Sequence, residues 1–100
     1  MKEKVYISGK ISGIEKEAFL LFENAENELI KSGFEPINPM KLPHNHDKSW
    51  HSYMKEDIIA LCQCDRVIML PNWKDSKGAI IENLIATMIG IPIFYANETI

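Results

Sequence analysis

One carboxylate, Glu82, stands in the segment DSKGAIIEN, which runs from Asp75 to Asn83 and has the features of a helix start. Between Gly78 and Gly90 no other residue is ionisable. A carboxylate held there can act as a nucleophile, but a first-turn glutamate stabilised by the helix dipole is also an ordinary feature of proteins. Burial would raise the pKa of Glu82 and nearby amide groups would lower it, so the sequence leaves the sign of the shift open.

A second polar segment, SGKISG, follows an apolar stretch near the start of the chain. Glycine lets the backbone approach a ligand closely, and amides, hydroxyls and a lysine suit phosphate or sugar oxygens. The spacing fits neither the P-loop nor the dinucleotide fingerprint, and an ordinary turn explains the segment equally well. Its candidate ligand-binding residues are Ser8, Gly9, Lys10 and Ser12.

Two aspartates in the text EDIIALCQCD are further candidates. Asp65 directly precedes an apolar run, where a turn residue that bonds its own backbone is common. Asp57 lies on a mostly apolar helix and, taken alone, is typical of a surface residue. Trp50 and Trp73 can stack on a base or sugar ring, although half-buried packing is as ordinary a role for tryptophan at a loop edge.

Three histidines, His44, His46 and His51, lie near Asp47 and could be interpreted as a metal cluster. They lie in and after a proline-bounded loop with no identifiable partner to orient them, so we expect no metal and no cofactor. Cys62 and Cys64 are one residue apart, and we expect them to be buried thiols at a helix end.

Hydrophobic periodicity predicts the elements that must position these residues. The predicted strands are Lys4–Ser8, Phe34–Ile37, Arg66–Leu70 and Ile91–Tyr95, and the predicted helices are Glu15–Ser32, Trp50–Gln63 and Lys77–Ile89. Strands that alternate with helices imply right-handed crossovers, and therefore an α/β fold with an open parallel sheet and helices on both faces. We expect about four strands in the order 2-1-3-4, in a single domain over residues 1–100.

Ligands of such sheets bind beyond the carboxyl ends of the strands, where the order of connection reverses. This point lies between the first and third strands, so the loops 9–13 and 71–76 should flank one crevice. The loop 39–49 has no periodicity and is long enough to be a lid or a binding loop.

The third helix offers two different faces. Ile81, Leu84, Ile85 and Met88 form a large apolar face, which we expect to pack on the sheet. The face around Glu82 is lined by small residues and is expected to contact a second copy of the chain. These small residues are Ala79, Ala86 and Gly90. We therefore expect a homodimer or a higher homo-oligomer.

The formal net charge is -3, and the lysines are scattered among glutamates rather than gathered in a basic stripe. A polymeric nucleic acid is therefore not an expected partner. The first apolar run is too short for a signal peptide, and no run approaches the roughly 20 residues of a membrane span. We expect no membrane association and a cytoplasmic location.

Taken together, three segments resemble one known family. They are VYISGKISG, then W-x-x-YM-x-x-DI-x-x-L-x-x-CD, then VIMLPNW-x-x-S-x-GA-x-x-E followed by A-x-x-x-G-x-P. In this order they resemble the nucleoside 2-deoxyribosyltransferase superfamily, in particular its short, poorly characterised members from phages and bacteria. The resemblance covers nearly the whole chain, and its specificity lies in the combination.

The resemblance implies a flavodoxin-like or Rossmann-like sheet and an enzyme without a cofactor. Such enzymes cleave or exchange the N-glycosidic bond of a (deoxy)nucleoside or its 5'-monophosphate through a covalent glycosyl-glutamate intermediate. The resemblance assigns the nucleophile to Glu82, its positioning to Tyr6, contact with the leaving base or assistance to its departure to Asp57, and phosphate binding to Ser76.

The candidate substrate-binding set then comprises Ser8, Gly9, Lys10, Ser12, Asp65, Asn72, Trp73, Ser76 and Gly78. Family members often have serine or proline where this chain has Lys10, whose charge favours a phosphorylated substrate. The family site is completed by a neighbouring subunit's carboxyl-terminal segment, where this chain has Asn97 and Glu98. Two alternatives stay open, namely a nucleotide-binding module without catalysis and a structural or oligomerisation protein.

Overall fold

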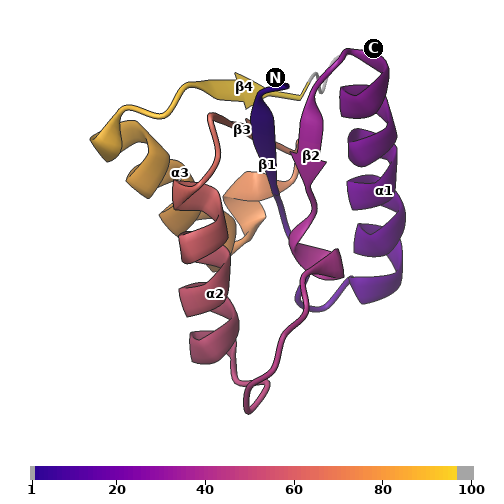
Figure 1. Ribbon diagram of the computed structural model, residues 1–100. Coiled ribbons are helices and arrows are strands. Elements are labelled where there is room, and N and C mark those ends of the chain that lie inside the picture. Colours follow the sequence, from indigo (N-terminus) through magenta and orange to yellow (C-terminus); the bar gives the residue numbers. More distant parts are fainter. Residues whose placement is uncertain (1, 97–100) are drawn as a thin grey trace.

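Four strands and three helices alternate along the chain in the computed structural model, which describes residues 2–96 (Figure 1). The elements are β1 (Lys4–Ser8), α1 (Glu15–Lys31), β2 (Glu35–Ile37), α2 (Trp50–Cys62), β3 (Arg66–Met69), α3 (Lys77–Ile89) and β4 (Ile93–Tyr95). All strand pairs are parallel and their order is β2-β1-β3-β4. The predicted open parallel sheet and its strand order are therefore confirmed.

The element ends differ from the predicted ones by at most two residues. The largest difference is at β4, which starts at Ile93 rather than Ile91. Ile91 donates its amide to the carbonyl of Ala86 and so closes the end of α3, next to Gly90 with its φ of 83°. The amide of Ile91 therefore hydrogen-bonds to the end of α3 rather than to a neighbouring strand.

Helices cover both faces of the sheet, as predicted (Figure 1). Side chains alternate along β1, so Val5 and Ile7 point to one face and pack with Ala18 and Phe22 of α1. Tyr6 points to the other face, into a core formed with α2 and α3. This alternation places Tyr6 and Ser8 on the same side of the sheet as α3.

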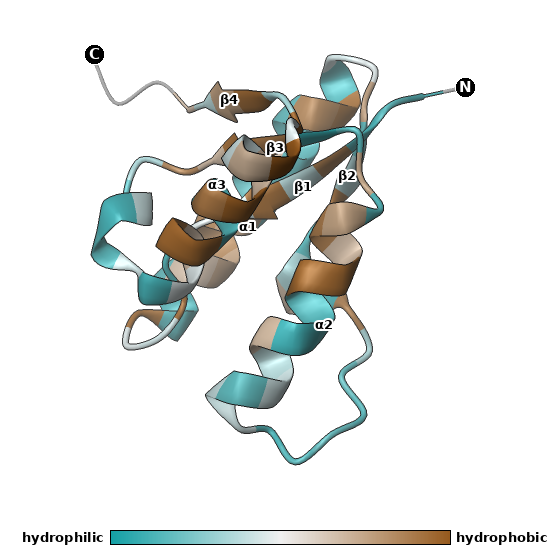
Figure 2. Cartoon of the chain, turned by 90° about the vertical axis from the view of Figure 1, so that its left-hand side faces the viewer, coloured by the Kyte–Doolittle hydropathy of each residue, from teal (hydrophilic) through white to brown (hydrophobic). Residues whose placement is uncertain are grey.

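The orientation of α3 differs from the prediction. Its small face is the one against the sheet, with Ala79, Glu82 and Ala86 buried, whereas Leu84 is 57% and Met88 is 76% exposed. The predicted assignment of the two faces is therefore wrong for Leu84 and Met88, although Ile85 does pack against the core. Small side chains let the helix backbone approach a sheet face that already carries bulky residues. Much of α3 is hydrophobic (Figure 2), and part of this apolar content is left exposed.

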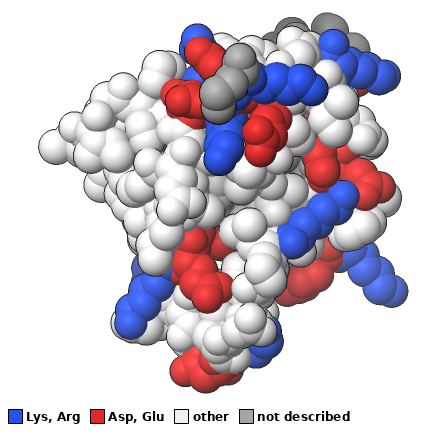
Figure 3. Space-filling view, in the orientation of Figure 1, with Lys and Arg blue, Asp and Glu red and all other residues white. Residues whose placement is uncertain are grey.

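Charged side chains of both signs are mixed on the face seen in Figure 3, while the area on the left, where α3 lies, carries none. Exposed ion pairs such as Lys41 with Glu26 and Arg66 with Glu3 join opposite charges. Within the described residues, no helix has the length and apolar character needed to cross a membrane.

Candidate active site

Glu82 is the buried carboxylate of α3, only 5% exposed. The Tyr6 hydroxyl donates to its Oε2 at 2.8 Å, and the Ser8 hydroxyl donates to its Oε1 at 2.6 Å. Ser76 fixes the start of the helix by accepting a hydrogen bond from the amide of Ala79 on its side-chain oxygen. The strand β1 and the helix α3 together hold one carboxylate with a donor on each oxygen.

The pKa of Glu82 is raised to about 7, chiefly by burial and to a smaller extent by the nearby Asp57, while the hydrogen bonds from Ser8 and Tyr6 act in the opposite direction. Burial also raises the pKa of the Tyr6 phenol well above its usual value, so Tyr6 keeps its proton and remains a donor. The result is a carboxylate that can be ionised near neutral pH without having a cation beside it.

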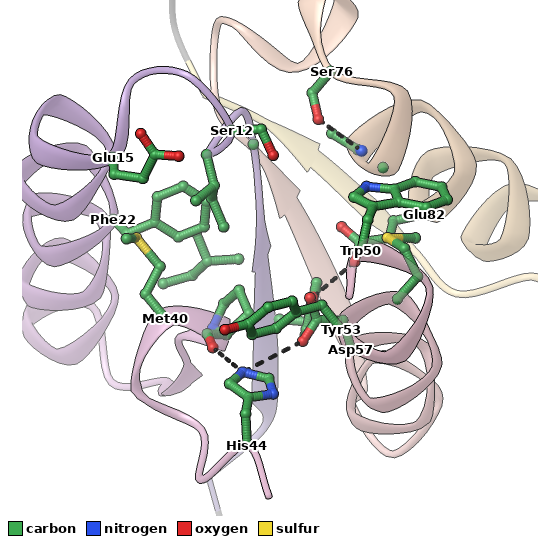
Figure 4. Close-up of a pocket in the computed structure, with 18 residues that line it drawn as sticks. Ser12, Glu15, Phe22, Met40, His44, Trp50, Tyr53, Asp57, Ser76 and Glu82 are labelled. Carbon is green, nitrogen blue, oxygen red and sulfur yellow. Dashed lines mark hydrogen bonds and ion pairs between the residues drawn. The ribbon is translucent and has the colours of Figure 1, made fainter. Parts of the chain in front are cut away.

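A cavity of about 380 Å³ opens beside Glu82, between α1 on one side and α2 and α3 on the other (Figure 4). Its polar lining includes Ser12, Glu15, His44, Asp57 and Ser76. The predicted crevice is found at the expected edge of the sheet, and the β1–α1 loop lines it. The loop 71–76 contributes only its last residue, and the segment after β2 takes its place.

Asp57 projects from α2 into the same cavity as Tyr6 and Glu82. Its Oδ1 atom is buried and has no hydrogen-bond partner among the described residues. Burial raises the pKa of Asp57 to about 6, and the proximity of His44 opposes this shift. The three residues that the resemblance assigned to the chemistry therefore line one cavity.

The face of α2 that lines the cavity includes Trp50, which the sequence analysis named as a residue that can stack on a ring, and two residues that it did not select. The two are Tyr53 and Met54, which line the cavity together with Trp50 and Asp57. Their spacing of i, i+3, i+4 and i+7 is one helical face, so the periodicity of α2 could have identified them as a group with Asp57.

A second hollow of about 320 Å³ adjoins the first and shares Ser12, Trp50 and Ser76 with it. Lys10 and Lys77 line it, and the Lys77 ammonium lies 4.8 Å from the centre of the Trp50 ring. Asp75 also lines it and adds one negative charge, while the hydroxyls, the two lysines and the start of α3 give the hollow donors for an anionic group.

Three of the predicted ligand residues have structural contacts outside the cavity. The amide of Lys4 donates to Asp65 at the amino end of β1, so Asp65 lies at the opposite edge of the sheet from the cavity. Trp73 packs against the core near Tyr95 and does not line the cavity. Asn72 accepts a hydrogen bond from the amide of Lys10 and so joins two loops.

The two predicted glycines do line the cavity, and packing explains both. A Cβ atom at Gly9 would lie 2.9 Å from the Cβ of Leu70, and one at Gly78 would lie 3.0 Å from the sulfur of Met54. Ser8, predicted to contact a ligand, instead donates to Glu82. Asn97 and Glu98 lie outside the described residues.

His44, His46 and Glu56 bring three potential metal-ligand atoms within 4.8 Å of one another. The Nδ1 atom of His46 accepts a hydrogen bond from the amide of Lys48, so the neutral ring carries its proton on Nε2, the atom that would face an ion. A metal ligand needs a free lone pair at that atom, and hydrogen bonds to Glu56 account for the cluster instead. The absence of a metal site stays a prediction that this arrangement supports.

Three comparisons place the chain among known proteins. The family described as "Domain of unknown function (DUF4406)" matches residues 3–95. No curated protein matches the chain. The structure is similar to that of a 2-deoxyribosyltransferase from the psychrotolerant bacterium Bacillus psychrosaccharolyticus, with a TM-score of 0.70 and 21% sequence identity, over 97% of this chain and 75% of that one.

A 2-desoxiribosyltransferase from Leishmania mexicana is also similar, with a TM-score of 0.71 and 15% identity. The match covers 93% of this chain and 63% of the Leishmania protein, so the chain spans less than two thirds of that protein's length. At these identities the likeness shows a shared fold, and the predicted flavodoxin-like or Rossmann-like architecture is confirmed.

Proposed function

The chain belongs to the DUF4406 family, a domain of unknown function, and from its cavity we propose that it cleaves or exchanges the N-glycosidic bond of a (deoxy)nucleoside or nucleoside 5'-monophosphate. Glu82 is the proposed nucleophile and forms a covalent ester with the sugar. Tyr6 is the proposed positioning group, and Asp57 is the proposed acid for the leaving base.

One observation carries this proposal: a carboxylate that is almost fully buried faces a cavity with a hydroxyl donating to each of its oxygens. Burying a charge without a cation destabilises a fold, so a protein retains such a group where its reactivity is used. The likeness in fold to two deoxyribosyltransferases is consistent with this reaction class.

In the proposed reaction, an oxygen of Glu82 attacks C1' of the sugar as the C1'–N bond breaks through an oxocarbenium-like state. The bonding electrons leave with the base nitrogen, and Asp57 supplies the proton that the base requires. Attack on C1' of the ester by water gives hydrolysis, and attack by a second base gives transfer; either step restores the Glu82 carboxylate.

The preferred form of the substrate in this proposal is the 5'-monophosphate. The hollow next to the cavity is lined by Lys10, Lys77 and the hydroxyls of Ser12 and Ser76 at the start of α3. These groups can neutralise and hydrogen-bond a phosphate attached to a sugar that lies over Glu82. A nucleoside lacks a group that would use them.

We also propose that the chain works as a homo-oligomer in the cytoplasm. The surface available for association is the outward face of α3, where Ile80, Leu84 and Met88 are exposed at a spacing of four residues. A cytoplasmic location agrees with the free thiols of Cys62 and Cys64, which reducing conditions preserve.

The proposal is tested with the four deoxynucleosides and their 5'-monophosphates, each with and without a free acceptor base. We expect release or exchange of the base, faster with monophosphates. Glu82→Gln keeps the size of the side chain but removes its charge, and should slow the reaction by at least about 10³-fold. Glu17→Gln, at an exposed position of α1, is the matched control and should behave as the wild type.

Trapping supplies a second readout. Mass spectrometry of the wild type under substrate should detect the added mass of the sugar or sugar phosphate on Glu82. If the ligand binds tightly but is recovered intact, the chain is a binding module. If Glu82→Gln retains wild-type rates, the covalent mechanism is wrong.

A further inference from the structure

His44 is a cavity-lining residue to which the proposed reaction gives no role. It lies in the loop before α2, and its side chain is 11% exposed. Its Nδ1 lies 2.7 Å from Oε1 of Glu56, and its Nε2 lies 3.0 Å from the carbonyl oxygen of Pro39. A carbonyl oxygen and an ionised carboxylate can only accept, so these two contacts suit a ring with a donor on each nitrogen, and Nδ1 also lies 3.4 Å from Nε2 of His46.

The surroundings keep this ring in one place. Tyr53 packs edge-on against both His44 and His46, with ring centres 4.7 Å and 4.6 Å apart. His46 donates from Nε2 toward Glu56 while its Nδ1 accepts from the backbone. Glu56 therefore lies against two histidine rings, and its contact with Nδ1 fixes the orientation of His44.

The His44 ring faces a carboxylate oxygen that has no hydrogen-bond partner among the described residues. The Nε2 atom of His44 lies 4.0 Å from Oδ1 of Asp57, the buried atom without a hydrogen bond. The remaining titratable groups near Asp57 are Glu56 on the same helix, Tyr6 on β1 and Glu82 on α3. His44 is thus the only cationic group beside Asp57 among the described residues.

We propose that His44, oriented by Glu56, supplies the proton that Asp57 passes to the leaving base. This inference rests on the proposed function. As the C1'–N bond breaks, the base nitrogen takes the proton of Asp57, and Asp57 takes the proton on Nε2 of His44, leaving a neutral imidazole. Nδ1 keeps its proton throughout, so the proton that restores His44 returns to Nε2 from water that enters the open cavity after the base has left.

The proposed pair of His44 and Asp57 holds one mobile proton in the cavity. The Oδ1 atom of Asp57 that lies nearest Nε2 of His44 is the buried atom without a hydrogen-bond partner among the described residues, so it is the atom that receives this proton.

Two substrates test the proposal. One is a purine deoxynucleoside 5'-monophosphate, whose base needs a proton to depart. The other is 4-nitrophenyl 2-deoxyribofuranoside 5-phosphate, whose 4-nitrophenolate leaves as a stable anion. For His44→Gln at pH 8 we expect purine release to fall by about 100-fold, as is typical for the loss of acid catalysis, and nitrophenolate release to fall by less than about threefold.

The pH profile gives a readout that a structural role would not move. Without His44, Asp57 depends on direct protonation, so the alkaline limb of purine release should move to lower pH and the loss at pH 6 should be smaller than at pH 8. Glu56→Gln should show the same pattern, and added imidazole should restore purine release to His44→Ala. His51→Gln, an exposed histidine of α2, is the matched control.

The outcomes separate the two proposals. Equal losses on both substrates, or an unchanged pH profile in His44→Gln, would overturn the role of His44 while leaving the reaction in place. A wild type that cleaves neither substrate would overturn the proposed function, and the role of His44 with it. Thermal melting of each variant identifies any that fail to fold. If His44→Gln does not fold, rescue of purine release in His44→Ala by added imidazole tests the role of His44 instead.

Discussion

The carboxylate of Glu82 accepts hydrogen bonds from the hydroxyls of Tyr6 and Ser8, but no cation lies beside it among the described residues. This combination has a consequence for stability, because the folded protein binds a proton at Glu82 more tightly than the unfolded chain does. The pKa of Glu82 is about 7 in the folded state, against an ordinary value of 4.5. Between these two pH values the folded state holds more protons, so the free energy of unfolding falls as pH rises and levels off above about 7.

Glu82→Gln should remove this part of the pH dependence. We expect the wild type to lose up to roughly 3 kcal/mol more stability than the variant between pH 5 and pH 8, from a pKa difference of this size. Urea unfolding at the two pH values measures this. Glu17→Gln should lose as much as the wild type, and an equal loss in Glu82→Gln would contradict the buried, uncompensated carboxylate.

At the level of single residues, the sequence analysis identified Glu82 but not the contacts of Ser8 and His44 around it. Glu82 was visible as the only ionisable residue between Gly78 and Gly90, and the family resemblance added Tyr6 and Asp57. The contact of Ser8 with Glu82 was not visible, because it depends on which face of α3 meets β1. His44 was considered only as a metal ligand, because the partner that orients it, Glu56, lies on another element.

Helix α3 is the element that decides the site. Its periodicity gave the correct bounds and two faces of different size, but periodicity does not say which face meets the sheet. The sheet face beneath it is already filled by bulky residues such as Tyr6 and Met69, so the small face fits there. A single sequence does not show which face of a helix fits the volume left on a sheet formed by distant parts of the chain.

Enlarging the buried face should therefore be costly. Ala86 is fully buried against the sheet, and Ala86→Leu should lower the free energy of unfolding by about 1–3 kcal/mol through overpacking. Thr87→Leu places the same side chain one position further, where it is exposed, and should change stability by no more than about 0.5 kcal/mol. Thermal or urea unfolding compares the two, and the reverse order would support the orientation first predicted from the sequence.

The whole molecule is a small three-layer domain that leaves one large apolar face uncovered (Figure 2). Exposed apolar side chains gathered on one helix favour association. The double variant Leu84→Glu and Met88→Glu should shift the assembly to a monomer of 11.5 kDa. Analytical ultracentrifugation measures the state of both proteins, and a monomeric wild type would contradict self-association.

At this scale the sequence was most informative. Alternating strand and helix patterns gave the strand order and both covered faces, because parallel crossovers allow few topologies for four strands. The position of the cavity along the sheet edge was only partly foreseen, since the loop after β2 has no periodicity and its path depends on contacts of His44 and Lys41 with distant residues.

The hydrogen bonds from Tyr6 and Ser8 to Glu82 join residues 76 and 74 positions apart in the chain. Such contacts can form only after β1 and β3 have paired and α3 has docked, because a loop of that length must close first. A nascent or half-folded chain therefore exposes Glu82 to water as an ordinary glutamate. The buried form of Glu82, with a hydroxyl donating to each carboxylate oxygen, exists only once folding is complete, so under the proposed function an immature chain is inactive.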